Sequence, residues 1–209
     1  RGVIDMNLKK YLAMAALVCM MSVSAEAAQI NTVIDTGSGM FAEPEKVYSE
    51  IDNAVKGWFP AKAGHTFVPA SDSDAIVQIY REEKGSTVNS DTMIAGTQAR
   101  DVSMTKDDLA HLSSELGSDY IMYFRVTNTV PTVSVGFMSA GQKTNVTTDF
   151  RIWDVKAGKY AFVKRYQTTG SSSSFYMGMG SASNAVKNGL EKALKQISAD
   201  KAKIVAAVQ

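Results

Sequence analysis

Cysteine is almost absent from this chain of 209 residues, which contains only Cys19. Disulfide frameworks and thiolate metal sites need several cysteines, so neither can hold this protein together. Histidine is nearly as scarce, since only His65 and His111 occur and neither stands at a metal-ligand spacing. We therefore expect no metal, no other cofactor and no catalytic thiol.

An excess of charge of either sign is also missing. The chain has 22 lysines and arginines against 21 aspartates and glutamates, a formal net charge of +1. Binding to nucleic acid draws on a basic patch or on runs of basic residues, and this sequence has neither. We expect no nucleic-acid partner.

Long apolar runs are missing as well, apart from one near the beginning of the sequence. Residues 11–23 are almost entirely apolar, follow two lysines, and precede the small-x-small cleavage pattern Ala25-Glu26-Ala27. This run is shorter than the roughly 20 apolar residues that span a membrane. It predicts a signal peptide and no transmembrane segment in the mature chain.

The signal peptide divides the chain and assigns it a destination. Met6 is the expected initiator, so we predict an upstream extension at residues 1–5, a signal peptide at residues 6–27 and a single mature domain at residues 28–209. Cys19 follows a valine rather than the small residue of a lipobox, which disfavours a lipid anchor. The mature protein is expected to be exported, to a periplasm or to the medium.

Periodic apolar positions predict alternating helices and strands. Spacings of three and four residues predict helices at 44–58, 105–116 and from about 182 to the end. Residues 75–80 fit the period of a helix or of a strand, and the acidic residues Asp72 and Asp74 before them favour a helix at 71–84. Alternation predicts strands at 29–36, 66–68, 119–128 and 131–137, and a hairpin of 144–154 with 159–169. This order predicts an α+β domain with helices packed on a mixed, largely antiparallel sheet.

Two small-residue segments are expected to interrupt this pattern. Gly141 predicts a turn, and residues 171–174 with 178–180 predict a flexible Ser/Gly connection to the last helix. Ser181 or Ser183 is expected to cap that helix.

Several motifs give the second half of the chain a family resemblance. They are Leu116-Gly117-Ser118-Asp119-Tyr120, Arg151-Ile152-Trp153-Asp154 with Gly158-Lys159, and a Ser/Gly stretch before an Ala-rich helix. Together they resemble the periplasmic domain of the curli-secretion channel subunit, penicillin-binding-protein activator lipoproteins and the TolB N-terminal domain. The resemblance covers residues 105–197. It implies a domain that scaffolds envelope machinery and catalyses no reaction.

One enzymatic alternative rests on Asp35. The segment Val33-Ile34-Asp35-Thr36-Gly37-Ser38 resembles the active-site loop of aspartic proteases. Their chemistry needs two aspartates sharing a proton, so a single copy requires a homodimer. The amphipathic helix predicted at 44–58 stands where a retroviral protease continues in strands, which favours an ordinary strand end with a turn.

The leading hypothesis is a non-enzymatic domain that binds another envelope or extracellular protein. Its candidate contact residues are the large apolar side chains of the Ser/Gly connection, namely Phe175, Tyr176, Met177 and Met179. Arg151 and Trp153 form a second candidate, an arginine–aromatic surface on the hairpin that a helix would otherwise cover. A third class of function, a small-ligand carrier, would use a pocket between the last helix and the sheet.

Overall fold

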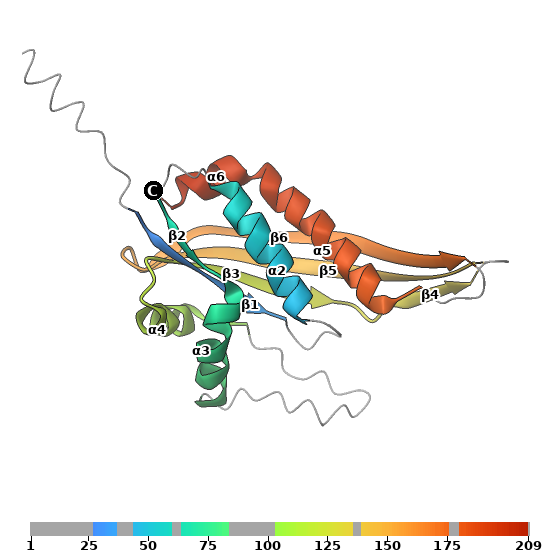
Figure 1. Cartoon of the computed structure of the whole chain (residues 1–209), viewed down its shortest axis with the longest axis horizontal. Coiled ribbons are helices and arrows are strands. Elements are labelled where there is room, and N and C mark those ends of the chain that lie inside the picture. Colours follow the sequence, from blue (N-terminus) through green and yellow to red (C-terminus); the bar gives the residue numbers. More distant parts are fainter. Residues whose placement is uncertain are drawn as a thin grey trace, which may run out of the picture.

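The computed structural model describes residues 27–36, 44–59, 64–83, 103–135, 139–175 and 180–208. Nearly all of the predicted signal peptide and its upstream extension lie outside these residues. Within them, no helix is long and apolar enough to cross a membrane. The described part folds as helices on both faces of one sheet (Figure 1).

The sheet is mixed, which confirms the predicted fold class. Its strands are β1 (Gln29–Asp35), β2 (Thr66–Val68), β3 (Tyr120–Asn128), β4 (Thr132–Val135), β5 (Ser139–Asp154) and β6 (Lys159–Phe175). β1 pairs in parallel with β2 and β3, whereas the β3–β5, β4–β5 and β5–β6 pairs are antiparallel. β5 is central, because β3 and β4 follow one another along one of its edges and β6 occupies the other.

The helices lie close to the predicted positions. They are α2 (Pro44–Trp58), α3 (Ala70–Glu83), α4 (Lys106–Leu116), α5 (Ala182–Ala199) and α6 (Lys201–Ala206). Thr105 and Asp108 form the expected capping box of α4, and Gly117 ends it at φ 61° in the left-handed region. Ser181 caps α5 through a hydrogen bond from the backbone N–H of Asn184.

The larger core lies between the sheet and helices α2, α5 and α6. Phe124 and Phe150 stack at its centre with ring centroids 4.5 Å apart, and Trp58 of α2 lies 5.6 Å from Phe150. Alternation along β3 and β5 supplies these side chains, because residues two apart in a strand face the same side. The apolar stripe of α5 covers them with residues Ala185, Val186, Leu190, Ala193, Leu194 and Ile197.

A smaller core lies on the opposite face, under α3 and α4. Leu109 and Leu112 of α4 pack against Ile121, Tyr123 and Trp153 of the sheet, and all five are buried. Both faces of β5 are therefore covered near Trp153, as its large side chains on both sides indicate.

Two predictions about small residues are wrong. Gly141 lies inside β5, paired with Ser134 and Ser173, and residues 171–174 are strand residues of β6 rather than a flexible connection. Serine and glycine have low strand propensity, but here the long hairpin already formed by β5 and β6 continues outward and supplies hydrogen-bond partners. Tertiary pairing outweighs local preference at these positions.

Candidate functional site

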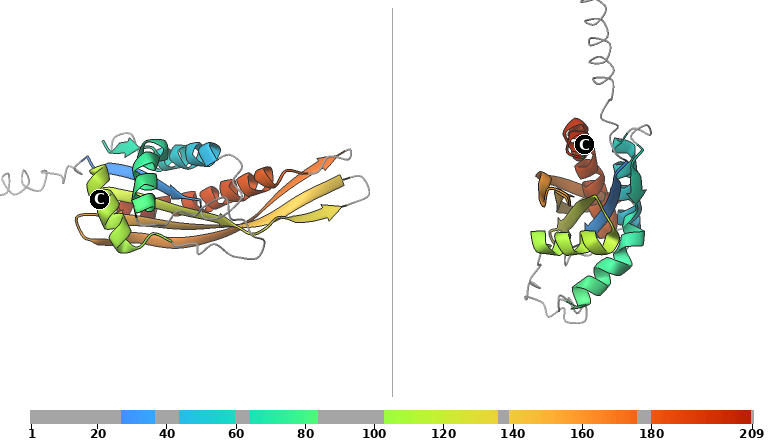
Figure 2. Two further views of the ribbon diagram at one scale, coloured as in Figure 1. Left: turned by 90° about the horizontal axis from the view of Figure 1, so that it is seen from below. Right: turned by 90° about the vertical axis from the view of Figure 1, so that its left-hand side faces the viewer.

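A three-stranded arm lies at one end of the sheet, and its outer part projects past the start of α5. The arm consists of β4, residues 139–145 of β5 and residues 169–175 of β6 (Figure 2). The start of α5 lies against its inner part, where the Ser181 N–H donates to the Ser172 hydroxyl and the Asn188 side chain donates to the Ser171 carbonyl. The pairing register continues without a shift across the three strands of the arm: Val133 lies opposite Gln142, and Gln142 lies opposite Ser172. The arm therefore extends the sheet beyond its hydrophobic core.

β4 is an open edge of this arm. Within the described residues it pairs with β5 alone, and β1, the neighbour of β3, ends at Asp35 opposite Arg125. Val133 is 54% exposed and Val135 is 80% exposed, and both point to the same face. An open strand edge with exposed valines and no charge is uncommon, since natural edges are usually protected by charge, proline or bulges.

Charge is nearly absent from the arm. Lys143 is its only charged residue, and the sequence between Arg125 and Asp149 contains no other. Within the described part of the chain, no carboxylate pairs with Lys143. The arm is thus a neutral surface with one isolated positive charge.

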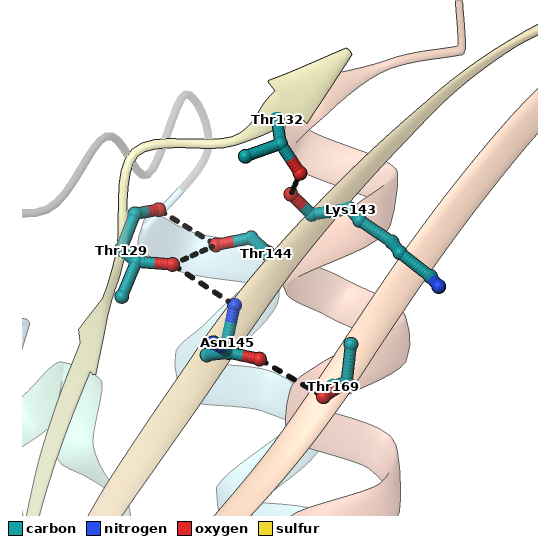
Figure 3. Close-up of a pocket in the computed structure, with 6 residues that line it drawn as sticks. All are labelled: Thr129, Thr132, Lys143, Thr144, Asn145 and Thr169. Carbon is teal, nitrogen blue, oxygen red and sulfur yellow. Dashed lines mark hydrogen bonds between the residues drawn. The ribbon is translucent and has the colours of Figure 1, made fainter. Parts of the chain in front are cut away.

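A polar hollow of about 300 Å³ lies where β3 passes into β4. It is lined by Thr129, Thr132, Lys143, Thr144, Asn145 and Thr169 (Figure 3). Several lining groups bond to one another: Thr144 donates to the carbonyl of Thr129 at 2.6 Å, and Thr169 donates to the Asn145 side chain at 2.9 Å. The Lys143 side chain runs outward on the side away from Thr132. The hollow is therefore braced by hydrogen-bonded threonines, and the Lys143 ammonium points away from Thr129 and Thr132 (Figure 3).

The arginine–aromatic cluster predicted around Arg151 and Trp153 is present, and its tryptophan is buried. The Arg151 guanidinium lies 5.6 Å from the ring of Tyr123, and its Nη1 donates to the carbonyl of Met104 at 3.4 Å. Trp153 is 4% exposed and packs against Tyr160 in the smaller core. Trp153 is therefore closed off in the smaller core, whereas Arg151 remains partly exposed.

The predicted apolar contact residues begin at the end of the arm. Phe175 is the last residue of β6, with its backbone opposite Ser139. Its side chain and residues 176–179, which include Tyr176, Met177 and Met179, lie outside the described residues.

Asp35 is held by two neighbours at the end of β1. Its carboxylate accepts a hydrogen bond from the Tyr123 hydroxyl at 2.8 Å and pairs with Arg81 at 3.1 Å. Burial, and then the charge of Asp35, raise the pKa of Tyr123, so the phenol stays protonated and donates. Asp35 is 8% exposed, which leaves little room for a second aspartate to share a proton with it. This geometry is that of a structural ion pair.

The interface between α5 and the sheet is tightly closed. A Cβ atom placed on Gly170 would lie 1.7 Å from the carbonyl oxygen of Ala185, and one on Gly189 would lie 2.4 Å from Cγ2 of Val146. Backbones this close leave no space at that point for the ligand of the carrier hypothesis. The described residues also contain no group of three or more potential metal ligands.

No protein-family model matches the chain, and no curated protein matches it. The solved structures that match include lipoprotein GNA1162 from Neisseria meningitidis, with 17% identity over 82% of this chain and 99% of that chain and a TM-score of 0.40. The LpoB C-terminal domain from Escherichia coli matches with 12% identity over 68% and 82% of the two chains and a TM-score of 0.33. The hypothetical protein CT253 from Chlamydia trachomatis matches with 8% identity over 86% and 99% and a TM-score of 0.39.

The solved structures that this chain is similar to thus include a lipoprotein and the LpoB C-terminal domain, the kinds of protein that the sequence resemblance named. At these identities and TM-scores the matches carry no argument about activity. The functional proposals therefore rest on the residues of this chain.

Val133, Val135 and Lys143 were not predicted from the sequence to form part of a binding surface. One signal was present, namely a long stretch with a single charge and alternating valine and hydroxyl residues around β4. Composition alone does not tell whether such a stretch is covered. Its exposure depends on where the helices end over the sheet.

Proposed function

We propose that this chain is an exported, non-enzymatic domain that binds another envelope or extracellular protein through its arm. An extended segment of the partner adds to β4 as a further strand. The main observation behind this proposal is the edge of β4, which has no further strand partner among the described residues, has no charge and exposes two valines. Strand addition supplies affinity through main-chain hydrogen bonds, and alternate side chains then supply specificity.

The apolar residues after β6 extend the proposed contact. Phe175 is the last paired residue of β6, and it stays a candidate contact residue together with Tyr176, Met177 and Met179, which follow it in the sequence. Arg151 and Trp153 are left out of the proposed surface, since Trp153 is buried in the smaller core and Arg151 donates to the Met104 carbonyl.

Cross-linking at the arm tests the proposal. A photoreactive residue at position 135, and in a parallel strain at position 163, is activated in cells, and the adducts are identified by mass spectrometry. Val163 is a matched control, because it is 60% exposed but lies on β6 away from the arm. We expect a specific envelope or extracellular protein at position 135 and not at position 163.

A charge placed on the edge gives the second test. The double substitution Val133→Lys with Val135→Lys should abolish that adduct, because an added strand would have to cover two ammonium groups. Unfolding free energy should change by only about 0.5 kcal/mol, since both side chains are exposed. Val163→Lys should leave the adduct intact. Retention of the adduct by the double variant would exclude β4 as the docking edge.

The protease alternative is tested separately. Reproducible peptide hydrolysis by the purified protein, lost in Asp35→Asn, would overturn the non-enzymatic proposal.

A further inference from the structure

The arm also indicates which charged group a strand added to β4 would contain. We infer that the segment added to β4 bears an aspartate or glutamate whose carboxylate is bound by Lys143. This inference rests on the proposed strand addition and names the chemistry of the partner.

The isolation of Lys143 is the first argument. It is the only charged residue of the arm, and no described carboxylate pairs with it. The Lys192 ammonium of α5, by contrast, donates to the Thr169 carbonyl at 2.7 Å. An open neutral edge beside one unpaired ammonium is electrostatically complementary to a segment with one negative charge. Such complementarity sets specificity and register more than raw affinity.

Register is the second argument. Lys143 stands opposite Thr132 of β4, so a residue added opposite Thr132 would face the same side of the sheet. The distance across two strand spacings is about 10 Å. The lysine side chain has a flexible four-carbon stem, so it and an acidic side chain can together reach across the short Thr132.

The hollow is the third argument. Small side chains at Thr129, Thr132 and Thr144 leave about 300 Å³ beside Lys143, on the side toward β4 (Figure 3). The Thr132 hydroxyl donates to the Lys143 carbonyl at 3.3 Å, and that of Thr144 donates to Thr129. The threonines are thus engaged within the sheet, and the ammonium is the group left to bind an anion. Only a rotation about the side-chain bonds of Lys143 is needed to bring it over the hollow.

A pair of strand-forming peptides tests the inference. Both are capped nonapeptides of alternating threonine and valine with a fluorescent label, and they carry glutamate or glutamine at the central position of the threonine face. Binding to the full chain is measured by fluorescence anisotropy. The glutamate peptide should bind about three- to fivefold more tightly, the range of a surface ion pair. The preference should shrink at high salt, because exposed charges are screened.

Substitutions assign the preference to one residue. Lys143→Ala should remove it, Lys143→Glu should reverse it and Lys143→Arg should keep it. Lys195→Ala is the matched control, since that lysine is exposed on α5 away from the arm. Melting curves of all four variants should coincide with that of the parent chain, because both lysines are exposed.

The outcomes separate the two proposals. Equal binding of both peptides, lost in the Val133→Lys, Val135→Lys variant, would overturn the acidic anchor and leave strand addition standing. A preference that survives Lys143→Ala would likewise overturn it. Binding of neither peptide, together with no adduct at position 135, would overturn both proposals.

Discussion

Replacing Gly170 with alanine should loosen α5 from the sheet. The new methyl carbon would lie 1.7 Å from the Ala185 carbonyl oxygen and 2.6 Å from the Gly189 nitrogen. Both are backbone atoms of α5, so no side-chain rotation relieves the overlap and the helix must move outward. Its buried stripe then loses packing on β5 and β6.

The expected size follows from overpacking in cores, which typically costs about 1–3 kcal/mol and sometimes more. Because the contact involves backbone, we expect Gly170→Ala to lower the free energy of unfolding by about 3 kcal/mol. For a domain of this size that corresponds to a fall in Tm of roughly 6–12 °C. Urea denaturation followed by circular dichroism, with a thermal melt, measures both quantities.

Two comparisons check the reasoning. Gly57→Ala in α2 places its methyl group in open space, so it should gain up to about 1 kcal/mol from helix propensity. Gly189→Ala would overlap Cγ2 of Val146, so pairing it with Val146→Ala should recover about 1–2 kcal/mol relative to the sum of the single changes. A Gly170→Ala protein that melts within about 1 °C of the parent would refute the close-contact argument, since the shift expected here is several times larger.

Two further predictions concern α4 and the α5–α6 junction. Thr105→Ala removes the side-chain acceptor for the Asp108 N–H, so it should lower the free energy of unfolding by about 1 kcal/mol in urea denaturation. An unchanged urea midpoint would show that this cap does not stabilise the fold. Asp200 accepts hydrogen bonds from Lys164 and Tyr166, which lower its pKa from 3.8 to about 2. Because the folded pKa is the lower one, this contribution to stability is complete above about pH 4 and is lost as the pH falls toward 2. Asp200→Asn should therefore flatten the decline in Tm between pH 4 and pH 2, and an identical decline in both proteins would contradict the assignment.

The regular elements were predictable because their signals are local. Apolar residues at three-to-four spacing define α2 and α4, and the capping box of Thr105 with Gly117 marks both ends of α4. The hairpin of β5 and β6 follows from alternation on both sides of a turn. Each of these signals is carried by residues only a few positions apart, so no knowledge of the rest of the fold is needed.

The ends of the long hairpin were not predictable in the same way. Gly141 and residues 171–174 have the composition of a turn and a linker, yet they are paired strand residues. Their conformation depends on pairing across the hairpin, as between Gly141 and Ser173, which are far apart in the sequence. The composition of a segment does not show whether its residues pair with another strand.

Sequence alone determined the near absence of cysteine, the balanced charge and the α+β order of elements, and it predicted the export signal. Tertiary structure decided which surfaces stay open. The same alternating pattern places Trp153 under α4 and Val135 in solvent, because α5 begins beside Ser172 and Val135 aligns with Ser174, beyond the start of that helix. Burial is a property of where distant segments end in space, so the candidate edge at β4 and the isolated charge at Lys143 became visible only in the folded chain.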